Sequence, residues 1–405
     1  MRKIISISLY FILFCSCITE KDEVTTQVKG TTKSHSEYKS ISKAIEDADN
    51  AFGLFFPTTK SSREVDSAFF ITNSIADTLL IVVNYDNNAG FALISAHENE
   101  PSVLGVFDRG NFQDCYKDNP GFQICYDEIL ANQNTLGKAR TYNQDYSVES
   151  TRISTSSLGP LISVNWGQRA PFNLYATNST TPLAGCTPIA IAQAMSYFEY
   201  PNGLSITYTD TTATQITLRW RELKAHSNDT YCTPLCETCK ALSHLLREIG
   251  HRCNANYNPS STGAWPYAEY LSKFRYQCKQ STSFNLDDIE EYIWDYRLAL
   301  LCGFNSSGTV GHTWVVDGIR NIKYKNRYYL ENPDGSETDA YIENCKDTYL
   351  HFNFGWYGSG NGFILCETEV ECNGTTTYPK TIFSGTYTDI RLQISNLRTN
   401  AAREI

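Results

Sequence analysis

The chain has 405 residues and a formal net charge of −10, from 44 acidic and 34 basic side chains. This length allows about two domains. The acidic balance, with no basic run after residue 3, argues against nucleic acid as a partner. Hydrophobic residues make up 41% and charged residues 19%, which is ordinary for a globular protein that buries a full core.

Residues 1–17 have the pattern of an export signal. Two basic residues precede the apolar run Ile4–Phe14, which is too short to span a bilayer as a mature helix. Ser16 directly before Cys17 resembles a bacterial lipobox, in which Cys17 is acylated after cleavage and anchors the chain to a membrane. Ordinary secretory cleavage is the alternative. The acidic residues that follow are similar to a surface-export signal, so we expect a lipoprotein of the outer membrane or cell surface.

Residues 18–40 are polar and rich in threonine, serine and lysine, which predicts a flexible tether. In residues 41–137 the apolar residues recur at helix and strand spacings, which predicts a small domain of helices and a sheet. Helical patterns lie at both ends of this region, near 41–52 and 120–132. The strand patterns between them lie at 67–72, 79–84, 90–95 and 103–107.

Residues 138–157 are polar and lack apolar periodicity. Exposed linkers of this kind are where proteolytic cleavage concentrates, so we expect a cut after Lys138, Arg140 or Arg152. Residues 158–405 form the remaining domain, and an α+β fold is predicted because helical patterns precede strand patterns. The helical patterns lie at 186–200, 236–250 and 264–274, and the strand patterns at 298–304, 312–319, 328–332, 348–353 and 362–366.

Cys186 follows Gly185 and opens a helical pattern. The apolar residues that recur at helical spacing are Ile189, Ala192, Met195 and Phe198. Backbone N–H groups and the helix dipole favour an anion at a helix N-terminus, so the thiol of Cys186 should titrate below a free cysteine. A cysteine that merely caps a core helix is the alternative.

A cysteine nucleophile needs a base, and the base needs a group that orients it. His312 is the best candidate base, because glycines precede it and a Trp-Val-Val strand pattern follows it. Asn353 can accept a hydrogen bond from an imidazole N–H and so fix the tautomer. His351 is a rival base, since strand alternation places it on the same face as Asn353.

Two further residues become candidates because of the predicted cysteine, histidine and asparagine. Gln168 lies ahead of the cysteine and can donate to a developing oxyanion together with the backbone N–H of Cys186. Trp356 lies in a glycine-rich turn, where it can shield the histidine's hydrogen bond from water.

The order Gln, Cys, His, Asn and the amino-acid sequences of five segments resemble those of the streptopain family of bacterial papain-like cysteine peptidases. The matching segments are N-W-G-Q-x-x-P-[FY]-N at 165–173, G-C-x-x-x-A-x-A-Q-x-M at 185–195, Y-x-P-S-S at 257–261, G-H-x-x-V-[IV]-D-G at 311–318 and H-x-N-x-G-W-x-G at 351–358.

The resemblance implies that Cys186 is the nucleophile, His312 the general base and acid, Gln168 the oxyanion donor and Asn353 the orienting residue. It implies a two-lobed papain-like domain over 158–405, preceded by an inhibitory propeptide over 41–137 that is removed by cutting the linker at 138–157. It also suggests a substrate cleft lined by Trp356, Ser260, Ser261 and Gly311.

The chain departs from the family pattern at two positions. Phe354 stands where the family usually has tryptophan, and Tyr357 stands where glycine is common. We expect phenylalanine still to cover the site, and the tyrosine to narrow the cleft.

Twelve cysteines remain besides Cys15 and Cys17. Disulfides or unpaired thiols are the favoured interpretation for an exported chain, with Cys115–Cys125 and Cys366–Cys372 as candidate pairs. Metal binding is the alternative, and the residues with metal-like spacing are Cys232, Cys236, Cys239, His251 and Cys253. The family resemblance requires neither a metal nor another cofactor.

We therefore expect the secreted zymogen of a cysteine endopeptidase. Its partners would be protein or peptide substrates, host proteins among the candidates, its own propeptide as an inhibitor, and a membrane through the lipid at Cys17. The alternative is a catalytically weak or inactive papain-fold protein that binds at the cell surface. Transglutaminase-like acyl transfer is less favoured, because such enzymes typically orient their histidine with an aspartate a short way downstream, whereas the candidate here is Asn353. An inhibitor built from the propeptide fold alone does not explain the C-terminal two-thirds of the chain.

Overall fold

The structure is a computed structural model. It describes residues 38–57, 63–74, 77–97, 102–139, 146–176, 182–208, 215–226, 236–257, 262–264, 268–281, 283–305, 307–332, 334, 336–372, 375–381 and 392–396. The predicted export signal with Cys17, most of the predicted tether, and Ser260 and Ser261 lie outside these residues. Among the described residues, no helix has both the length and the apolar character needed to cross a membrane.

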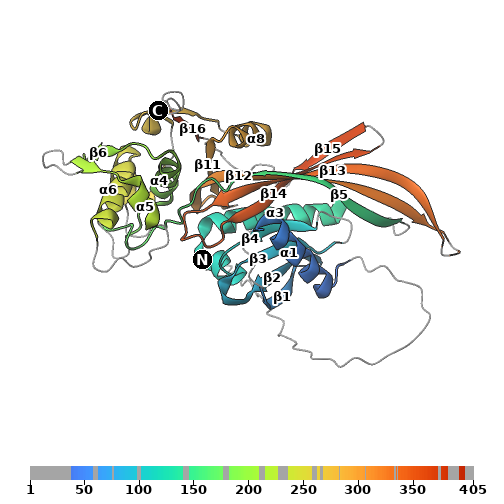
Figure 1. The fold of residues 1–405 in the computed structure, drawn as a ribbon. Helices are drawn as coiled ribbons and strands as arrows, with labels where there is room; N and C mark the ends of the chain where they lie inside the picture. The colour runs from blue at the N-terminus through green and yellow to red at the C-terminus, as the bar shows by residue number, and fades with distance from the viewer. Residues whose placement is uncertain are drawn as a thin grey trace, which may run out of the picture. The chain divides into compact units, whose positions relative to one another are not determined.

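A sheet of 12 strands runs through the described chain, in the order β1-β2-β3-β4-β14-β13-β12-β11-β16-β10, with β15 beside β14 and β5 beside β12 (Figure 1). Its strands are β1 (Val65–Thr72), β2 (Thr78–Tyr85), β3 (Phe91–Ser95), β4 (Val103–Phe107), β5 (Tyr146–Leu158), β10 (Tyr276–Lys279), β11 (Leu298–Phe304), β12 (Gly311–Glu331), β13 (Glu337–Asn353), β14 (Gly362–Cys372), β15 (Thr375–Thr381) and β16 (Leu392–Asn396). Two small ribbons pair β6 (Gly203–Ser205) with β7 (Gln215–Thr217) and β8 (Asn256–Tyr257) with β9 (Thr262–Gly263).

The helices are α1 (Ile41–Phe55), α2 (Phe112–Asp118), α3 (Pro120–Ala139), α4 (Cys186–Phe198), α5 (Trp220–Ala225), α6 (Glu237–Arg252), α7 (Ala268–Ser272) and α8 (Leu286–Trp294). The sequence patterns predicted all of these regions as helical except α2, α5 and α8. Short helices such as α5 offer fewer than two turns of pattern, which is too little for periodicity to be read.

The sheet joins the N-terminal unit, residues 38–139, to the rest of the chain. β4 pairs antiparallel with β14, where Val106 lies opposite Phe363. The two strands also share one hydrophobic core with α1, α3 and β12. The predicted boundary at 137–138 is therefore not a boundary of the sheet or of the core.

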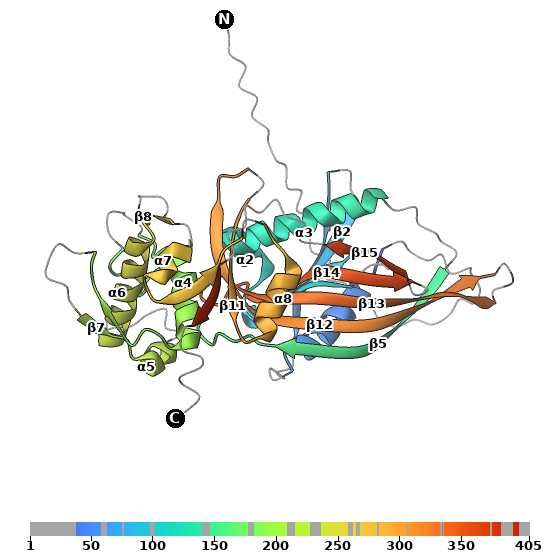
Figure 2. The same cartoon turned by 90° about the horizontal axis from the view of Figure 1, so that it is seen from above.

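Helices cover both faces of β2 and β3, which explains why nearly every residue of these strands is buried. On one face, Phe52 of α1 packs edge-on against Tyr85. On the other face, Phe122 of α3 packs edge-on against Phe91. Figure 2 shows α3 beside β2.

Strand β5 corrects the expectation that residues up to 157 form a linker without regular structure. It pairs with β12 from Leu158, opposite Ile319, to Tyr146, opposite Leu330. Nearly all of its described side chains are exposed, including Ile153 at 58%. An edge strand with both faces in solvent needs no apolar alternation, so periodicity could not reveal it, although its valine, isoleucine and threonine residues favour strand.

Strand β12 is longer than either of the two strands predicted within it. From residue 322 onward its side chains are no longer fully buried, and charged residues alternate with tyrosines. Its partners β5 and β13 supply the hydrogen bonds that keep it extended. Figure 1 shows these three long strands side by side.

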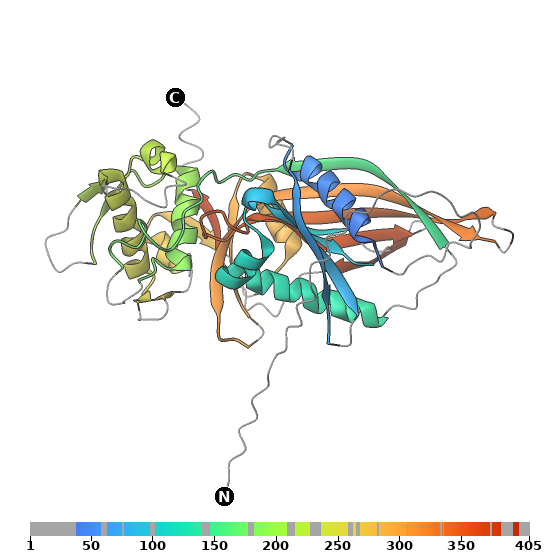
Figure 3. The same cartoon turned by 90° about the horizontal axis from the view of Figure 1, so that it is seen from below.

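A second core packs α4 and α6 against β11 and β12. Met195 of α4, Leu245 of α6 and Val315 of β12 are fully buried in it. Figure 3 shows α4, α5 and α6 grouped together beside this part of the sheet. The core therefore fixes the start of α4, where Cys186 lies, against the start of β12, where His312 lies.

Candidate active site

Cys186 is the first residue of α4, as predicted, and its side chain is half-buried. Gly185 caps the helix with φ of 98°, a conformation that favours glycine. The next residue, Thr187, is fully buried and its hydroxyl donates to the carbonyl of Ala264 at 2.8 Å. Thr187 Oγ1 also lies 2.9 Å from Thr313 Oγ1, which ties the start of α4 to β12.

The environment of Cys186 lowers its thiol pKa to about 7. Burial raises the pKa, but the charge of His312 and a hydrogen bond with its imidazole outweigh burial. Backbone hydrogen bonds from Thr313 and Thr187 also favour the thiolate. The predicted nucleophile and base therefore lie within hydrogen-bonding reach of each other, and a large fraction of the thiol is ionised near neutral pH.

The imidazole of His312 is oriented by a backbone carbonyl. Its Nε2 lies 2.8 Å from the carbonyl oxygen of Phe354, and the side chain is only 2% exposed. A carbonyl can only accept, so Nε2 carries the proton, and Nδ1 is left to accept a proton from the thiol. This is the tautomer that a cysteine nucleophile requires of its base.

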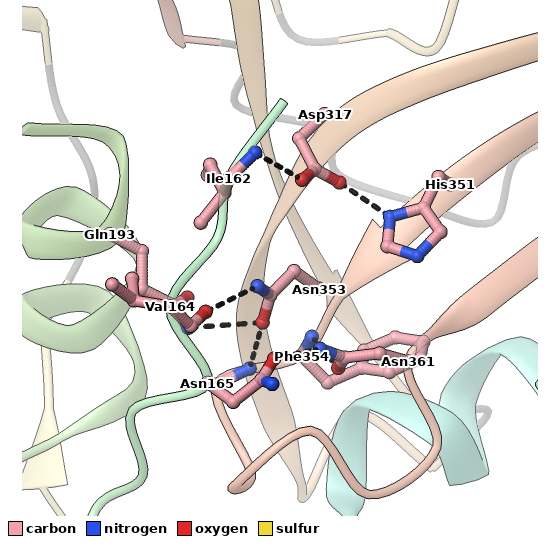
Figure 4. Close-up of polar contacts among 10 residues, drawn as sticks. Ile162, Val164, Asn165, Gln193, Asp317, His351, Asn353, Phe354 and Asn361 are labelled. Atoms are coloured by element: carbon pink, nitrogen blue, oxygen red, sulfur yellow. Dashed lines mark hydrogen bonds and ion pairs between the residues drawn. The ribbon is translucent and has the colours of Figure 1, made fainter. Parts of the chain in front are cut away.

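Asn353 corrects one predicted contact, because its side chain bonds the turn rather than the imidazole. Its Oδ1 accepts from Gln193 Nε2 at 3.0 Å and from the backbone N–H of Gly355 at 3.2 Å. Its Nδ2 donates to the carbonyl of Val164 at 3.2 Å. Figure 4 shows these contacts around Asn353. These three bonds hold the turn whose carbonyl reaches His312.

Phe354, one of the two departures from the family pattern, contributes its backbone to the site and its ring to the core. The ring is fully buried and lies 5.8 Å from that of Trp314. Its N–H donates to Asn361 Oδ1 at 2.9 Å, and Asn361 Nδ2 donates to Asn165 Oδ1 at 3.4 Å. The ring therefore belongs to the core, while both backbone groups of the residue are fixed.

His351, the rival base, is committed to another contact. Its Nδ1 lies 2.6 Å from Asp317 Oδ1, and the other oxygen of Asp317 accepts from the N–H of Ile162 at 3.0 Å (Figure 4). Both side chains are buried. This pair ties β12, β13 and the segment before α4 together, and the imidazole that bonds Cys186 is that of His312.

Gln168 lies in a buried loop next to the start of α4. Its backbone carbonyl accepts from the N–H of Ala184 at 2.8 Å, two residues before Cys186. Tyr357 packs against this loop, and its hydroxyl accepts from the N–H of Arg169 at 2.9 Å. Its ring lies so close to Gly167 that a Cβ added there would be only 2.4 Å from it. The second departure from the family pattern therefore supports the predicted oxyanion loop.

Tyr357 has φ of 58°, the left-handed region in which glycine is favoured. This explains in physical terms why glycine is common there in the family. Trp356 is half-buried, with its ring edge-on to His312 at 6.4 Å, as a cover for the imidazole. Gly311, predicted to line the cleft, is exposed at the start of β12.

The N-terminal unit contacts the site directly. A Cβ added to Gly121, in the first turn of α3, would lie 2.5 Å from Cδ2 of His312 and 2.5 Å from a ring carbon of Phe354. Beside this contact, Asn119 Nδ2 donates to the carbonyl of Ser359 at 2.8 Å. The start of α3 therefore covers the imidazole and the turn that orients it.

Neither of the two candidate disulfides forms in the structure. Cys115 is a thiol whose sulfur lies 3.1 Å from Ser359 Oγ. Cys366 and Cys372 are both thiols on β14. Six residues of strand separate their Cα atoms by about 20 Å, far beyond the ~7 Å that a disulfide allows.

Comparison with known proteins identifies the region that carries this site. Residues 166–364 match the Peptidase C10 family. The thiol protease/hemagglutinin PrtT of Porphyromonas gingivalis is 25% identical over 359 residues, 79% of this chain and 38% of that protein. Streptopain of Streptococcus pyogenes is 23% identical over 317 residues, 69% of this chain and 71% of streptopain.

The fold is similar to a solved fragment of prointerpain A of Prevotella intermedia. The TM-score is 0.52 at 17% sequence identity, over 82% of this chain and 98% of that fragment. The matched region contains Gln168, Cys186, His312 and Asn353. These findings bear out the resemblance to the streptopain family over the matched region, and the structure confirms a mixed fold of helices and strands.

Proposed function

We propose, on the premise that residues 166–364 are a Peptidase C10 domain, that this chain is the zymogen of a cysteine endopeptidase. The observation that carries the proposal is the Cys186–His312 pair, in which the thiol pKa falls to about 7. A buried helix N-terminus and a carbonyl-bound imidazole together supply a nucleophile and a proton carrier at neutral pH. The substrates are peptide bonds in proteins.

The residues support the following sequence of steps. The Cys186 thiolate attacks the carbonyl carbon of the peptide bond, and the N–H of Cys186 and the Gln168 side chain receive the oxyanion. The His312 imidazolium gives its Nδ1 proton to the leaving amine, and an acyl-enzyme remains. His312 then takes a proton from water, and the hydroxide attacks the thioester carbonyl. The C–S bond breaks, the new carboxyl end of the substrate leaves, and the Cys186 thiolate beside the His312 imidazolium is restored. Nε2 keeps its bond to Phe354 throughout.

Inhibition by residues 41–137 is supported by the contact of Gly121 with His312. A helix start that fills the space beside the imidazole leaves no room there for a substrate. Cutting the segment 138–157 would break the covalent link between this unit and the catalytic region. Of the candidate bonds, the one after Arg152 is disfavoured, because Arg152 is paired with Tyr324 inside the sheet.

The place of action follows from sequence alone. The signal pattern of residues 1–17 and the lipobox-like Cys17 support export and a lipid anchor, and cleavage in 138–157 would break the covalent link between the catalytic region and that anchor. Proteins outside the cell, host proteins among them, are then the accessible substrates. The chain spans 38% of the length of PrtT, a thiol protease/hemagglutinin, and peptide hydrolysis is the only activity that we propose for it.

The test is the intact mass of the purified chain after incubation, with and without an epoxide inhibitor of papain-like enzymes. We expect self-processing within 138–157 and one adduct that maps to Cys186, both absent in Cys186→Ala. If trypsin cuts the linker, the N-terminal fragment is removed, and neither adduct nor protein hydrolysis follows, the proposal is wrong, and a binding protein with an inactive papain fold replaces it.

A further inference from the structure

A cluster of one histidine and two cysteines lies where α5 ends and α6 begins, and the proposed peptidase chemistry does not use it. The ligand atoms of His226, Cys236 and Cys239 all lie within 4.8 Å of one another. We propose that these three residues bind one zinc ion. Neither the family match nor the resemblance to solved structures points to a metal here.

The distances fit a zinc centre. Zinc–sulfur bonds of about 2.3 Å and zinc–nitrogen bonds of about 2.0–2.1 Å at tetrahedral angles place two sulfurs ~3.8 Å apart and sulfur and nitrogen ~3.6 Å apart. Cys236 Sγ lies 3.4 Å from Cys239 Sγ and 3.9 Å from His226 Nε2. These two distances are within a few tenths of an ångström of the zinc values, and the third pair, His226 and Cys239, lies within 4.8 Å. A bonded disulfide would need the sulfurs at about 2.05 Å.

The local structure favours thiolates, which are the form that zinc binds. Cys236 is the N-cap of α6, and its sulfur accepts from the N–H of Cys239 at 3.4 Å. The positive end of the α6 dipole stabilises negative charge on this sulfur. Cys239 is 3% exposed, while Cys236 and His226 are half-buried, so an ion can reach the cluster from solvent.

The ligand set differs from the one that sequence spacing indicates. His251 and Cys253 lie at the far end of α6, and twelve residues of helix separate His251 from Cys239 by about 18 Å. His226 replaces them because α5 ends beside the start of α6. Cys232 lies outside the described residues. Two thiolates and an imidazole suit zinc better than magnesium or calcium, which prefer oxygen donors.

The ion would join two helices of the lobe that carries the nucleophile. α5 packs on α6, and α6 packs on α4, whose first residue is Cys186. Leu223 of α5 and Leu245 of α6 lie in the same core as α4. A zinc ion bound by these three side chains would fix the edge of the helical lobe, and its fourth position would be open to water or to another residue.

The experiment uses the full chain with Cys186→Ala, so that the catalytic thiol cannot bind metal. The reduced, chelator-treated protein is titrated with Zn²⁺ against a chromophoric chelator, and with Co²⁺ while its absorption spectrum is followed. We expect one ion per chain, with the thiolate-to-cobalt charge-transfer band and the intense ligand-field bands of tetrahedral cobalt.

Variants decide which residues bind the ion. Cys239→Ser and His226→Asn should each lose tight zinc binding, whereas His251→Asn on the same helix and Cys278→Ser should keep it. Circular dichroism checks that each variant is folded. In the parent chain, Zn²⁺ should also slow alkylation of Cys236 and Cys239 but not of Cys278. Zinc binding that survives Cys239→Ser, or a reduced protein that binds no zinc and closes a Cys236–Cys239 disulfide in air, would overturn the proposal.

Discussion

At the scale of single residues, the site depends on a backbone atom that no side-chain motif could reveal. The sequence predicted Cys186, His312 and Asn353 as a set, and the structure brings all three to one place. The group that orients His312, however, is the carbonyl of Phe354 at 2.8 Å. Because every residue has a backbone carbonyl, the sequence cannot indicate which one orients the imidazole. Gln193 was visible in the matched segment at 185–195, but only the structure pairs it with Asn353.

This geometry predicts that Asn353 acts by positioning the turn. In the processed enzyme, Asn353→Ala should lower kcat by about 10²-fold with little change in KM, as expected when a catalytic group is misplaced by ~1 Å. Gln193→Met, which removes a bond to Asn353 and touches no imidazole, should lower kcat in the same direction by a smaller factor. Steady-state kinetics on a peptide substrate measure both. A full effect of Asn353→Ala beside no effect of Gln193→Met would indicate direct contact with His312 instead.

At the scale of elements, the start of α3 is the part that most directly opposes activity. Its backbone at Gly121 lies against both His312 and Phe354. Sequence patterns predicted the helix, but they could not place it on the imidazole, because this contact joins residues almost 200 positions apart. Strand β5 was missed for the opposite reason, since a solvated edge strand leaves no apolar signal.

Gly121→Ala should therefore weaken inhibition. A methyl group there must displace α3 or His312, since the available distance is 2.5 Å, although alanine favours helix over glycine. We expect faster self-processing than in the parent chain, followed by electrophoresis over time. Gly53→Ala in α1 is the matched control, because a Cβ there meets nothing within 4 Å. Equal rates for the parent and both variants would show that the α3 contact does not limit activation.

At the scale of the whole molecule, the continuous sheet couples the N-terminal unit to the catalytic region. β4 pairs with β14 through residues 105–107, and the core on both sides of this junction is shared. The sequence predicted both parts and the α+β class, since each carries its own local patterns. The pairing of β4 with β14 is non-local, and with one sequence no local pattern encodes it.

Cleavage of the linker alone should therefore not release the N-terminal unit. After a single cut within 138–157, we expect the two fragments to elute together in size-exclusion chromatography and to have low activity towards proteins. Activity should rise when the N-terminal fragment is digested further or removed by mild denaturant. Immediate separation of the fragments upon the first cut would contradict the role of the β4–β14 pairing.

The most direct test of the central claim is the pH dependence of Cys186 alkylation by iodoacetamide, mapped by mass spectrometry on the unprocessed chain. The account predicts that the thiolate appears with a midpoint at about pH 7, because His312 offsets the effect of burial. In His312→Ala the charge and hydrogen bond are gone, burial dominates, and the midpoint should move to higher pH. A midpoint near the ~8.5 of a free cysteine, unchanged by His312→Ala, would contradict the pairing of Cys186 with His312.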